Sequence, residues 1–259
     1  MKNIAFLVSG NIRIYEKNLS FLENLKKEFY NYEIIFICSF WQNQKNLDEF
    51  NKKYKVKFFN QIKEKDWSNE ISRIKYVTGG ENLSYKIQNV FHMWHSITEN
   101  IEFLELVVKK NNLKVDYVCR FRTDIMTLKE IKHLKKDLEK IENNQILFSS
   151  NRHFRGITDL FFIGKYEAFL KIKKILNYFQ KFINDERVFD PEYIFYSFIT
   201  ENDIKIKIAY KLDIALIRIE EAKPTKIVFV PFRDKIKMKI AKRKIKINKL
   251  LSRFRYIFD

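Results

Sequence analysis

Residues 2–11 read KNIAFLVSGN, in which an apolar run at 4–8 is followed by a Ser9-Gly10-Asn11 turn. A short unbroken apolar run that ends in a turn is typical of a strand buried on both faces of a parallel sheet. Working outward from it, the next elements are a helix at 19–29, a strand at 33–39, a helix at 48–54 and a strand at 55–59. This order predicts an α/β fold with a doubly wound, mostly parallel central sheet and right-handed crossovers.

The rest of the chain continues the alternation of strands and helices. The polar segment 63–82 is expected to form a loop over one end of the sheet, and 84–110 has the apolar stripe of a long amphipathic helix. Apolar runs predict strands at 117–121, 145–149, 160–163, 205–209 and 215–219, and helical spacing predicts helices at 131–141, 166–182 and 191–202. We expect one catalytic domain over residues 1–232.

The composition limits the class of protein. With 46% hydrophobic and 16% aromatic residues the chain can bury a large core, so it is not disordered. The formal net charge of +18 indicates an anionic partner, such as a phosphorylated substrate, an anionic membrane or nucleic acid. Cys38 and Cys119 both lie in apolar runs and are expected to be free thiols of the core. No segment has the length or apolar character of a signal peptide or a spanning helix, so we expect a cytoplasmic protein.

Residues 233–259 differ in character from the rest. Between Arg233 and Arg255 there are eleven basic residues and one acid, Asp234. The apolar residues fall on one helical stripe, which contains Ile236, Ile240, Ile247, Leu251, Phe254 and Phe258. This pattern predicts a basic amphipathic helix that binds an anionic membrane surface. A helix packed on the domain with a solvated basic face, or a surface for another partner, is the alternative.

The stretch at 116–124, DYVCRFRTD, holds the most informative polar residues. It predicts a buried strand that ends in a charged cluster, and the carboxyl edge of an open α/β sheet is where ligands bind. Arg120 and Arg122 are two residues apart and share a face. Guanidinium groups suit phosphate or carboxylate recognition, and an aspartate such as Asp124 suits a hard divalent cation. The residues alone equally allow an ion-pair network that closes the strand end.

The sequence 116–126 resembles the Arg-x-Arg-x-Asp signature of bacterial surface-polysaccharide glycosyltransferases, in particular the WavE-like lipopolysaccharide-synthesis family and related capsule enzymes. Further islands occur in the family's order: LVSGNIR at 7–13, CSFW at 38–41, SYKIQNVFHMWHSI at 84–97, ITDLFFIG at 157–164 and DPEYIFYSFITENDIKI at 190–206. The resemblance covers about residues 3–210. It implies a GT-A-like, Rossmann-like fold and a nucleotide-sugar donor, which we expect to be UDP-linked.

The resemblance also implies roles for single residues. Asp124 would hold Mn²⁺ or Mg²⁺ against the donor diphosphate, and the metal would stabilise the leaving nucleoside diphosphate. Candidate donor-binding residues are Gly10, Arg13, Lys86, Arg120 and Arg122. Asp159 and Glu192 are the candidate general bases for the acceptor hydroxyl. For Glu192 the alternative is a first-turn acid stabilised by the helix dipole.

These observations predict a glycosyltransferase that adds a sugar to a surface glycan or glycolipid, such as capsule or lipooligosaccharide, at the cytoplasmic face of the inner membrane. Three alternatives stay open. The first is a metal-independent glycosyltransferase of sialyltransferase-like type that relies on arginine or histidine. The second is a protein that binds nucleic acid, which we do not expect because the excess charge gathers at the C-terminus and no nucleic-acid-binding motif is present. The third is a membrane-surface scaffold without activity.

Overall fold

The computed structural model describes residues 1–12, 15–42, 44, 46–75, 84–127, 130–149, 157–209, 212 and 214–216, with the side chains of 15–17, 84–86 and 215–216 left out. All of these residues belong to one compact unit, Met1–Leu216. The predicted amphipathic helix at 233–259 and the predicted boundary after residue 232 lie outside the described residues.

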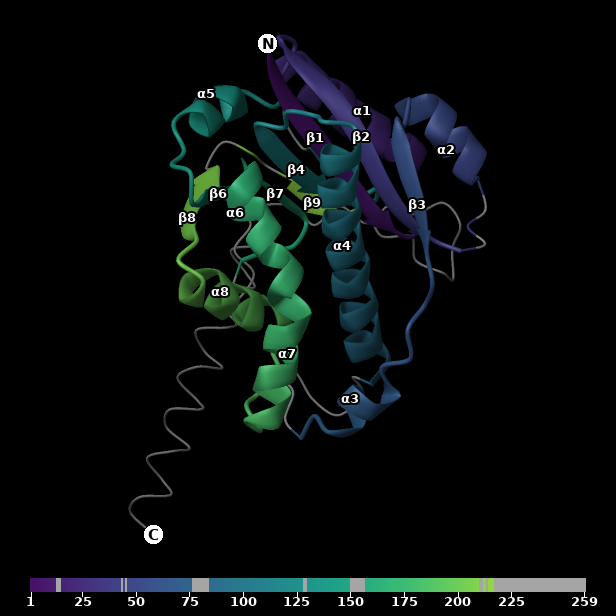
Figure 1. Cartoon of the computed structure of the whole chain (residues 1–259), viewed down its shortest axis with the longest axis vertical. Coiled ribbons are helices and arrows are strands. Elements are labelled where there is room, and N and C mark those ends of the chain that lie inside the picture. The colour runs from purple at the N-terminus through teal and green to yellow at the C-terminus, as the bar shows by residue number, and fades with distance from the viewer. Residues whose placement is uncertain are drawn as a thin grey trace. The chain divides into compact units, whose positions relative to one another are not determined.

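Within the described residues a seven-stranded sheet runs through the centre of the unit (Figure 1). Its strands, in sheet order, are β3 (Phe58–Ile62), β2 (Tyr32–Trp41), β1 (Lys2–Gly10), β4 (Tyr117–Phe121), β7 (Phe161–Lys165), β6 (Gln145–Ser149) and β8 (Lys205–Ala209). β7 is antiparallel to both of its neighbours, and the other strand pairs are parallel. Two short strands, β5 (Ile125–Thr127) and β9 (Ile214–Leu216), form a separate antiparallel pair.

Helices cover both faces of the sheet. Their bounds are α1 (Tyr15–Glu28), α2 (Leu47–Tyr54), α3 (Ser68–Ser72), α4 (Ser84–Lys110), α5 (Leu134–Glu139), α6 (Tyr166–Leu170), a 3₁₀ turn at Lys171–Lys174, α7 (Ile175–Asn184) and α8 (Pro191–Glu201). Successive strand residues point to opposite faces. In β1, Ala5 and Leu7 therefore pack with α4, whereas Phe6 and Val8 pack on the face of α1 and α2.

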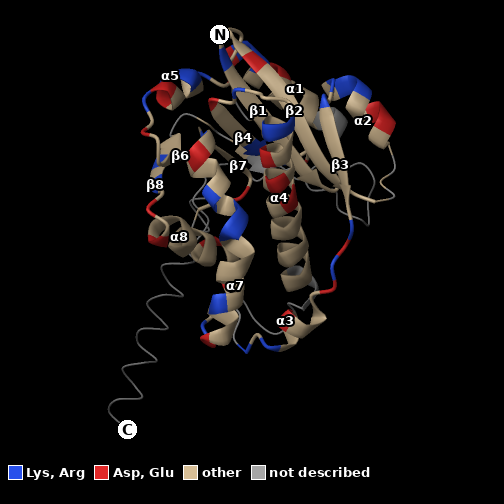
Figure 2. Cartoon of the chain, in the orientation of Figure 1, with Lys and Arg blue, Asp and Glu red and all other residues tan. Residues whose placement is uncertain are grey.

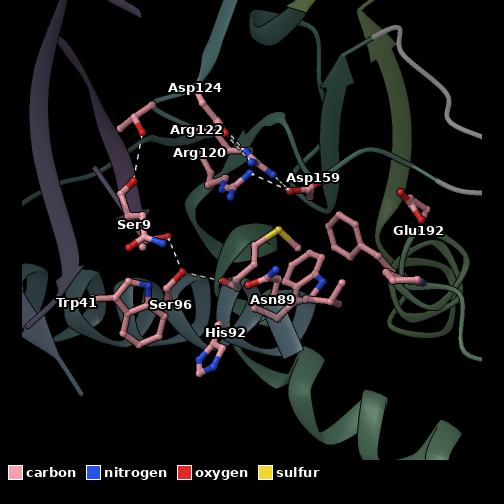
Figure 3. Close-up of a pocket in the computed structure, with 18 of the residues that line it drawn as sticks. Ser9, Trp41, Asn89, His92, Ser96, Arg120, Arg122, Asp124, Asp159 and Glu192 are labelled. Atoms are coloured by element: carbon pink, nitrogen blue, oxygen red, sulfur yellow. Dashed lines mark hydrogen bonds and ion pairs between the residues drawn. The ribbon is translucent and has the colours of Figure 1, made fainter. Parts of the chain in front are cut away.

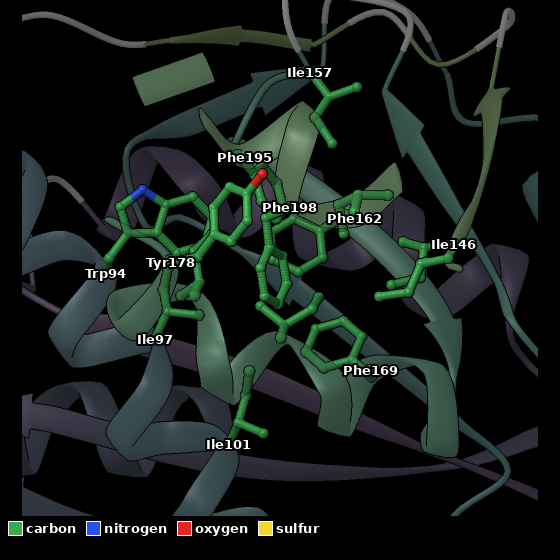
Figure 4. Packing of buried hydrophobic residues seen from close by; sticks show 14 of the residues in the cluster. Trp94, Ile97, Ile101, Ile146, Ile157, Phe162, Phe169, Tyr178, Phe195 and Phe198 are labelled. Atoms are coloured by element: carbon green, nitrogen blue, oxygen red, sulfur yellow. The ribbon is translucent and has the colours of Figure 1, made fainter. Parts of the chain in front are cut away.

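The core on the α4 face lies between that helix, the sheet and the helices α7 and α8. Figure 4 shows Ile97 and Ile101 of α4 in the same cluster as Phe162 of β7 and Phe195 of α8. A buried polar contact fixes α4 along the sheet: the Asn100 side-chain amide donates to the carbonyls of Val8 (3.1 Å) and Ile37 (3.4 Å). These bonds set how far α4 reaches past the carboxyl ends of β1 and β2.

The predicted fold class, a mostly parallel α/β sheet flanked by helices, is confirmed. The long helix at 84–110 and the strand at 117–121 have the predicted bounds. The third strand was predicted at 55–59 but starts at Phe58, because Lys55 adopts a left-handed conformation (φ 51°) that ends α2. The predicted helix at 166–182 is interrupted by the 3₁₀ turn, and the expected loop at 63–82 contains α3.

Acidic and basic residues occur together along described helices. Figure 2 shows both signs on α2 and on α5, for example. Cys38 and Cys119 are buried free thiols, as expected. Among the described helices there is none whose length and hydropathy would suit a membrane span.

Candidate active site

A pocket of about 310 Å³ opens at the carboxyl ends of β1, β2 and β4 (Figure 3). It also receives residues from the segment before β7 and from the first turn of α8. Because β7 runs antiparallel to β4, its amino end lies at the same edge of the sheet as the carboxyl end of β4. The pocket is lined by Ser9, Gly10, Asn11, Trp41, Asn89, Val90, His92, Met93, Trp94, Ser96, Arg120, Arg122, Thr123, Asp124, Ile157, Asp159, Pro191, Glu192 and Phe195.

One wall of the pocket is a charged cluster built from Arg120, Arg122, Asp124 and Asp159. The Arg122 guanidinium donates from Nε to Asp124 Oδ1 and from Nη2 to Asp124 Oδ2, both at 2.7 Å. This is the bidentate geometry in which an arginine–carboxylate pair is strongest. Asp159 is held more loosely: its Oδ2 lies 3.4 Å from Arg122 Nη1 and 3.7 Å from Arg120 Nη1.

The two arginines differ in their surroundings. Arg120 is only 3% exposed, and its Nε and Nη1 have no hydrogen-bond partner among the described residues. Burial lowers the pKa of Arg120 to about 10, and the charge of Asp159 offsets this only in part. For Arg122 burial also disfavours the charged form, but the hydrogen bonds and charges of Asp124 and Asp159 outweigh it and raise the pKa.

The turn that carries Arg122 and Asp124 is held from beneath by buried polar groups. The Asn18 side-chain amide donates to the carbonyl oxygen of Ile125 at 2.6 Å and to that of Arg122 at 3.3 Å. The Tyr54 hydroxyl in turn donates to Asn18 Oδ1 at 3.1 Å. The Thr123 hydroxyl donates to the Asn11 carbonyl at 3.2 Å and so ties the turn to the end of β1. The charged cluster therefore stands on a fixed backbone.

The opposite wall is neutral and partly aromatic. One face of α4 contributes Asn89, His92, Met93 and Ser96, which recur at the 3–4-residue spacing of a helix. Trp41, the last residue of β2, packs edge-on against His92 with ring centroids 5.6 Å apart. The His92 Nδ1 atom is buried without a hydrogen-bond partner among the described residues. This wall offers hydrogen bonds and an aromatic surface but no full charge.

Gly10 lies where the two walls meet at the end of β1. Its φ is +89°, a backbone conformation that residues with a Cβ rarely adopt. A Cβ at this position would lie 3.3 Å from Ser96 Oγ and 3.8 Å from Trp41 Nε1. Glycine therefore serves both the turn and the close approach of α4 to the strand end.

Glu192 lies near the charged wall, in the first turn of α8. The helix begins at Pro191, and the Asp190 side chain caps it by accepting a hydrogen bond from the Tyr193 backbone NH at 3.1 Å. Burial raises the pKa of Glu192, and the charges of Asp190 and Asp159 raise it further. Unlike Asp159, Glu192 forms no ion pair with a described lysine or arginine.

Six of the eight residues predicted from the sequence come together in this pocket: Gly10, Arg120, Arg122, Asp124, Asp159 and Glu192. Arg13 and the side chain of Lys86 lie outside the described residues. Sequence reasoning did not select Asn89, His92 or Ser96 as pocket residues. Their helical spacing was visible, but only the position of α4 relative to the sheet edge shows that this face lines a pocket.

The charged cluster does not fit the metal role that the resemblance implies for Asp124. Both carboxylate oxygens of Asp124 already accept a hydrogen bond from Arg122. A hard divalent cation takes six or more oxygen ligands or keeps several waters, and protein sites supply part of that set with carboxylates. Within the described residues no group of three or more His, Cys, Asp or Glu side chains could hold a metal ion.

No family model and no curated protein matches the sequence. Among solved structures the chain is similar to the apo crystal structure of mouse xyloside xylosyltransferase 1, with a TM-score of 0.42 and 8% sequence identity. The similarity covers 80% of this chain and 85% of that chain. At this level of similarity no property of that enzyme is carried over to the pocket.

The bidentate pair predicts a stability effect. Asp124→Asn removes the negative charge beside the largely buried Arg122 guanidinium. Because the remaining charge then lacks its main counterion, the free energy of unfolding should fall by about 3 kcal/mol. The matched control is Glu142→Gln, which removes one charge from the exposed pair with Lys205 and should change stability by about 0.5 kcal/mol or less. Urea denaturation measures both. Equal effects of the two substitutions would contradict the assigned strength of the Arg122–Asp124 pair.

Proposed function

We propose that this chain is a glycosyltransferase that uses a nucleotide-sugar donor. The observation that carries the proposal is the division of one pocket into two chemically different walls at the carboxyl edge of the sheet. The neutral wall of Trp41, Asn89 and His92 suits the nucleotide base, which presents an aromatic face and amides. It also suits the sugars, which present hydroxyls. The charged wall of Arg120 and Arg122 suits a diphosphate. A pocket at this edge is also where open α/β sheets bind ligands.

The proposed donor lies across the end of β1. Gly10 lines the pocket there, and its neighbours Ser9 and Asn11 offer hydrogen-bonding groups at the same edge. Arg13 and Lys86 stay proposed phosphate contacts on the strength of the resemblance alone. We propose UDP as the nucleotide on the same ground.

Glu192 is the better of the two candidate bases. Asp159 is already engaged by two guanidinium groups, whose Nη1 atoms lie 3.4 and 3.7 Å from its Oδ2. Glu192 has no such partner, and burial raises its pKa towards the range in which a carboxylate accepts a proton readily. We therefore assign to Glu192 the removal of the proton from the acceptor hydroxyl, and to Asp159 the balancing of the arginine charges.

The acceptor is proposed to be a surface glycan or glycolipid, reached at the cytoplasmic face of the membrane. This proposal rests on the basic, amphipathic sequence pattern of residues 233–259, which would bring the pocket to lipid-linked acceptors.

A thermal-shift screen tests the donor assignment. A ligand that binds only the folded state raises the melting temperature. We expect one family of nucleoside diphosphates and their sugars to raise it by several degrees, and the matching nucleoside without phosphates to raise it much less. A chain whose melting temperature responds to none of these ligands would refute the proposed function.

Replacing the proposed base should affect the chemical step rather than donor binding. Glu192→Gln is expected to lower kcat about 10²–10⁴-fold, with donor affinity little changed, whereas Glu167→Gln on the exposed side of α6 should have no effect. Because the base must be deprotonated and its pKa is raised, activity should be lost as the pH falls through a value above the ordinary 4.5 of glutamate. A Glu192→Gln enzyme that keeps its full rate would shift the assignment to Asp159.

The membrane proposal has its own measurement. A chain that ends at Phe232 should lose binding to vesicles containing anionic lipid but keep the nucleotide response in the thermal-shift screen. Vesicles of neutral lipid serve as the control, since the electrostatic attraction requires anionic headgroups. Undiminished vesicle binding by the shortened chain would show that residues 233–259 are not the membrane contact.

A further inference from the structure

We propose that Arg120 and Arg122, rather than a divalent cation, supply the positive charge that holds the donor diphosphate. This inference rests on the proposed function and specifies how its charged wall works. It departs from the metal role that the resemblance implies for Asp124, because the Arg122 guanidinium points at the Asp124 carboxylate.

The Asp124 carboxylate is already engaged by Arg122. Its two oxygens each accept a 2.7 Å hydrogen bond from Arg122, so the carboxylate edge that would face a cation is covered by a guanidinium group. A metal ion there would have to share the carboxylate with another positive charge or displace the arginine. Displacement would leave Arg122 with only its 3.4 Å contact to Asp159. The Asp124 carboxylate thus serves to orient Arg122.

Arg120 carries guanidinium donors that no described residue satisfies. It is buried, it lines the pocket, and its Nε and Nη1 have no hydrogen-bond partner among the described residues. Buried polar groups are nearly always hydrogen-bonded, because an unsatisfied donor keeps its full desolvation cost. Both Arg120 atoms are shielded from solvent, so a phosphate oxygen reaches Nη1 by taking the place of Asp159 Oδ2, which lies 3.7 Å from it. The planar guanidinium fork matches phosphate geometry.

Asp159 occupies the position beside the two arginines that an anionic ligand would take. It faces both arginines through Oδ2, but at 3.4 and 3.7 Å its contacts are much longer than the 2.7 Å bonds of Asp124. Asp159 is therefore the weaker of the two counterions and the one that diphosphate oxygens would displace. It competes with the ligand for the arginines.

This arrangement gives Asp159 opposite roles under the two possible chemistries. If the arginines bind the diphosphate, Asp159→Asn removes a competing negative charge and should tighten binding. If a cation held by the aspartates binds the diphosphate, the same substitution removes a ligand and should weaken binding. The sign of the change separates the two.

The experiment is calorimetric titration of the full chain with inorganic pyrophosphate and with the nucleoside diphosphate found in the thermal-shift screen, in EDTA and in Mn²⁺. We expect affinities within about twofold in the two buffers, at least tenfold weaker binding for Arg120→Met, and tighter binding for Asp159→Asn. The control Arg73→Met removes an exposed arginine that contacts Asn184 and does not line the pocket, and it should bind like the wild type.

Binding that requires Mn²⁺, or a weaker Asp159→Asn variant, would overturn the inference and leave the proposed function standing. Wild-type affinity in Arg120→Met would overturn it as well. Thermal denaturation checks that Arg120→Met is folded, and the comparison of EDTA with Mn²⁺ needs no variant. If neither pyrophosphate nor any nucleoside diphosphate binds in either buffer, the proposed function itself fails.

Discussion

The pocket depends on the placement of Arg120 in a strand that is otherwise apolar and central to the sheet. β4 is bordered by β1 and β7, so a charged side chain on this central strand stays away from bulk water. Two carboxylates from different parts of the chain compensate the charge. Asp124 follows the strand directly, and Asp159 arrives because β7 pairs antiparallel with β4, with Phe161 opposite Phe121. Among the described strands of the main sheet, the antiparallel β7 is thus what completes the charge balance of the site.

The helix α4 joins this charged edge to the core. Its first half presents Asn89, His92 and Ser96 to the pocket, and its second half presents Ile97, Ile101 and Leu104 to the sheet. The change from polar to apolar falls where the helix passes from beyond the strand ends to above the strands. The Asn100 amide, bonded to carbonyls of β1 and β2, fixes that point. Pocket shape and core packing are therefore set by the same contact.

Much of the fold could be predicted because local sequence patterns indicate its helices and strands. The apolar runs at 4–8 and 117–121 are strands, and the stripe at 84–110 is one helix. The gathering of Gly10, Arg120 and Asp124 followed from the rule that parallel strands meet at their carboxyl ends. The features that could not be predicted depend on contacts between distant segments or on small local differences in backbone conformation. The pairing of β5 with β9 joins segments almost ninety residues apart. The break at 171–174 has no glycine or proline to mark it.

The spacing Arg-x-Arg-x-Asp is compatible with two opposite chemistries, since its aspartate can hold a cation and its arginines can hold an anion. The sequence could not decide between them, because the decision lies in which lone pairs and which N–H groups are already occupied. In this structure each Asp124 oxygen accepts a short bond from Arg122, whereas Arg120 keeps unmatched donors and, among the described residues, meets the longer contact with Asp159. The unmet bonding capacity of the cluster is therefore cationic. Because a ligand gains most where a buried group lacks a partner, an anion gains more from this cluster than a cation does.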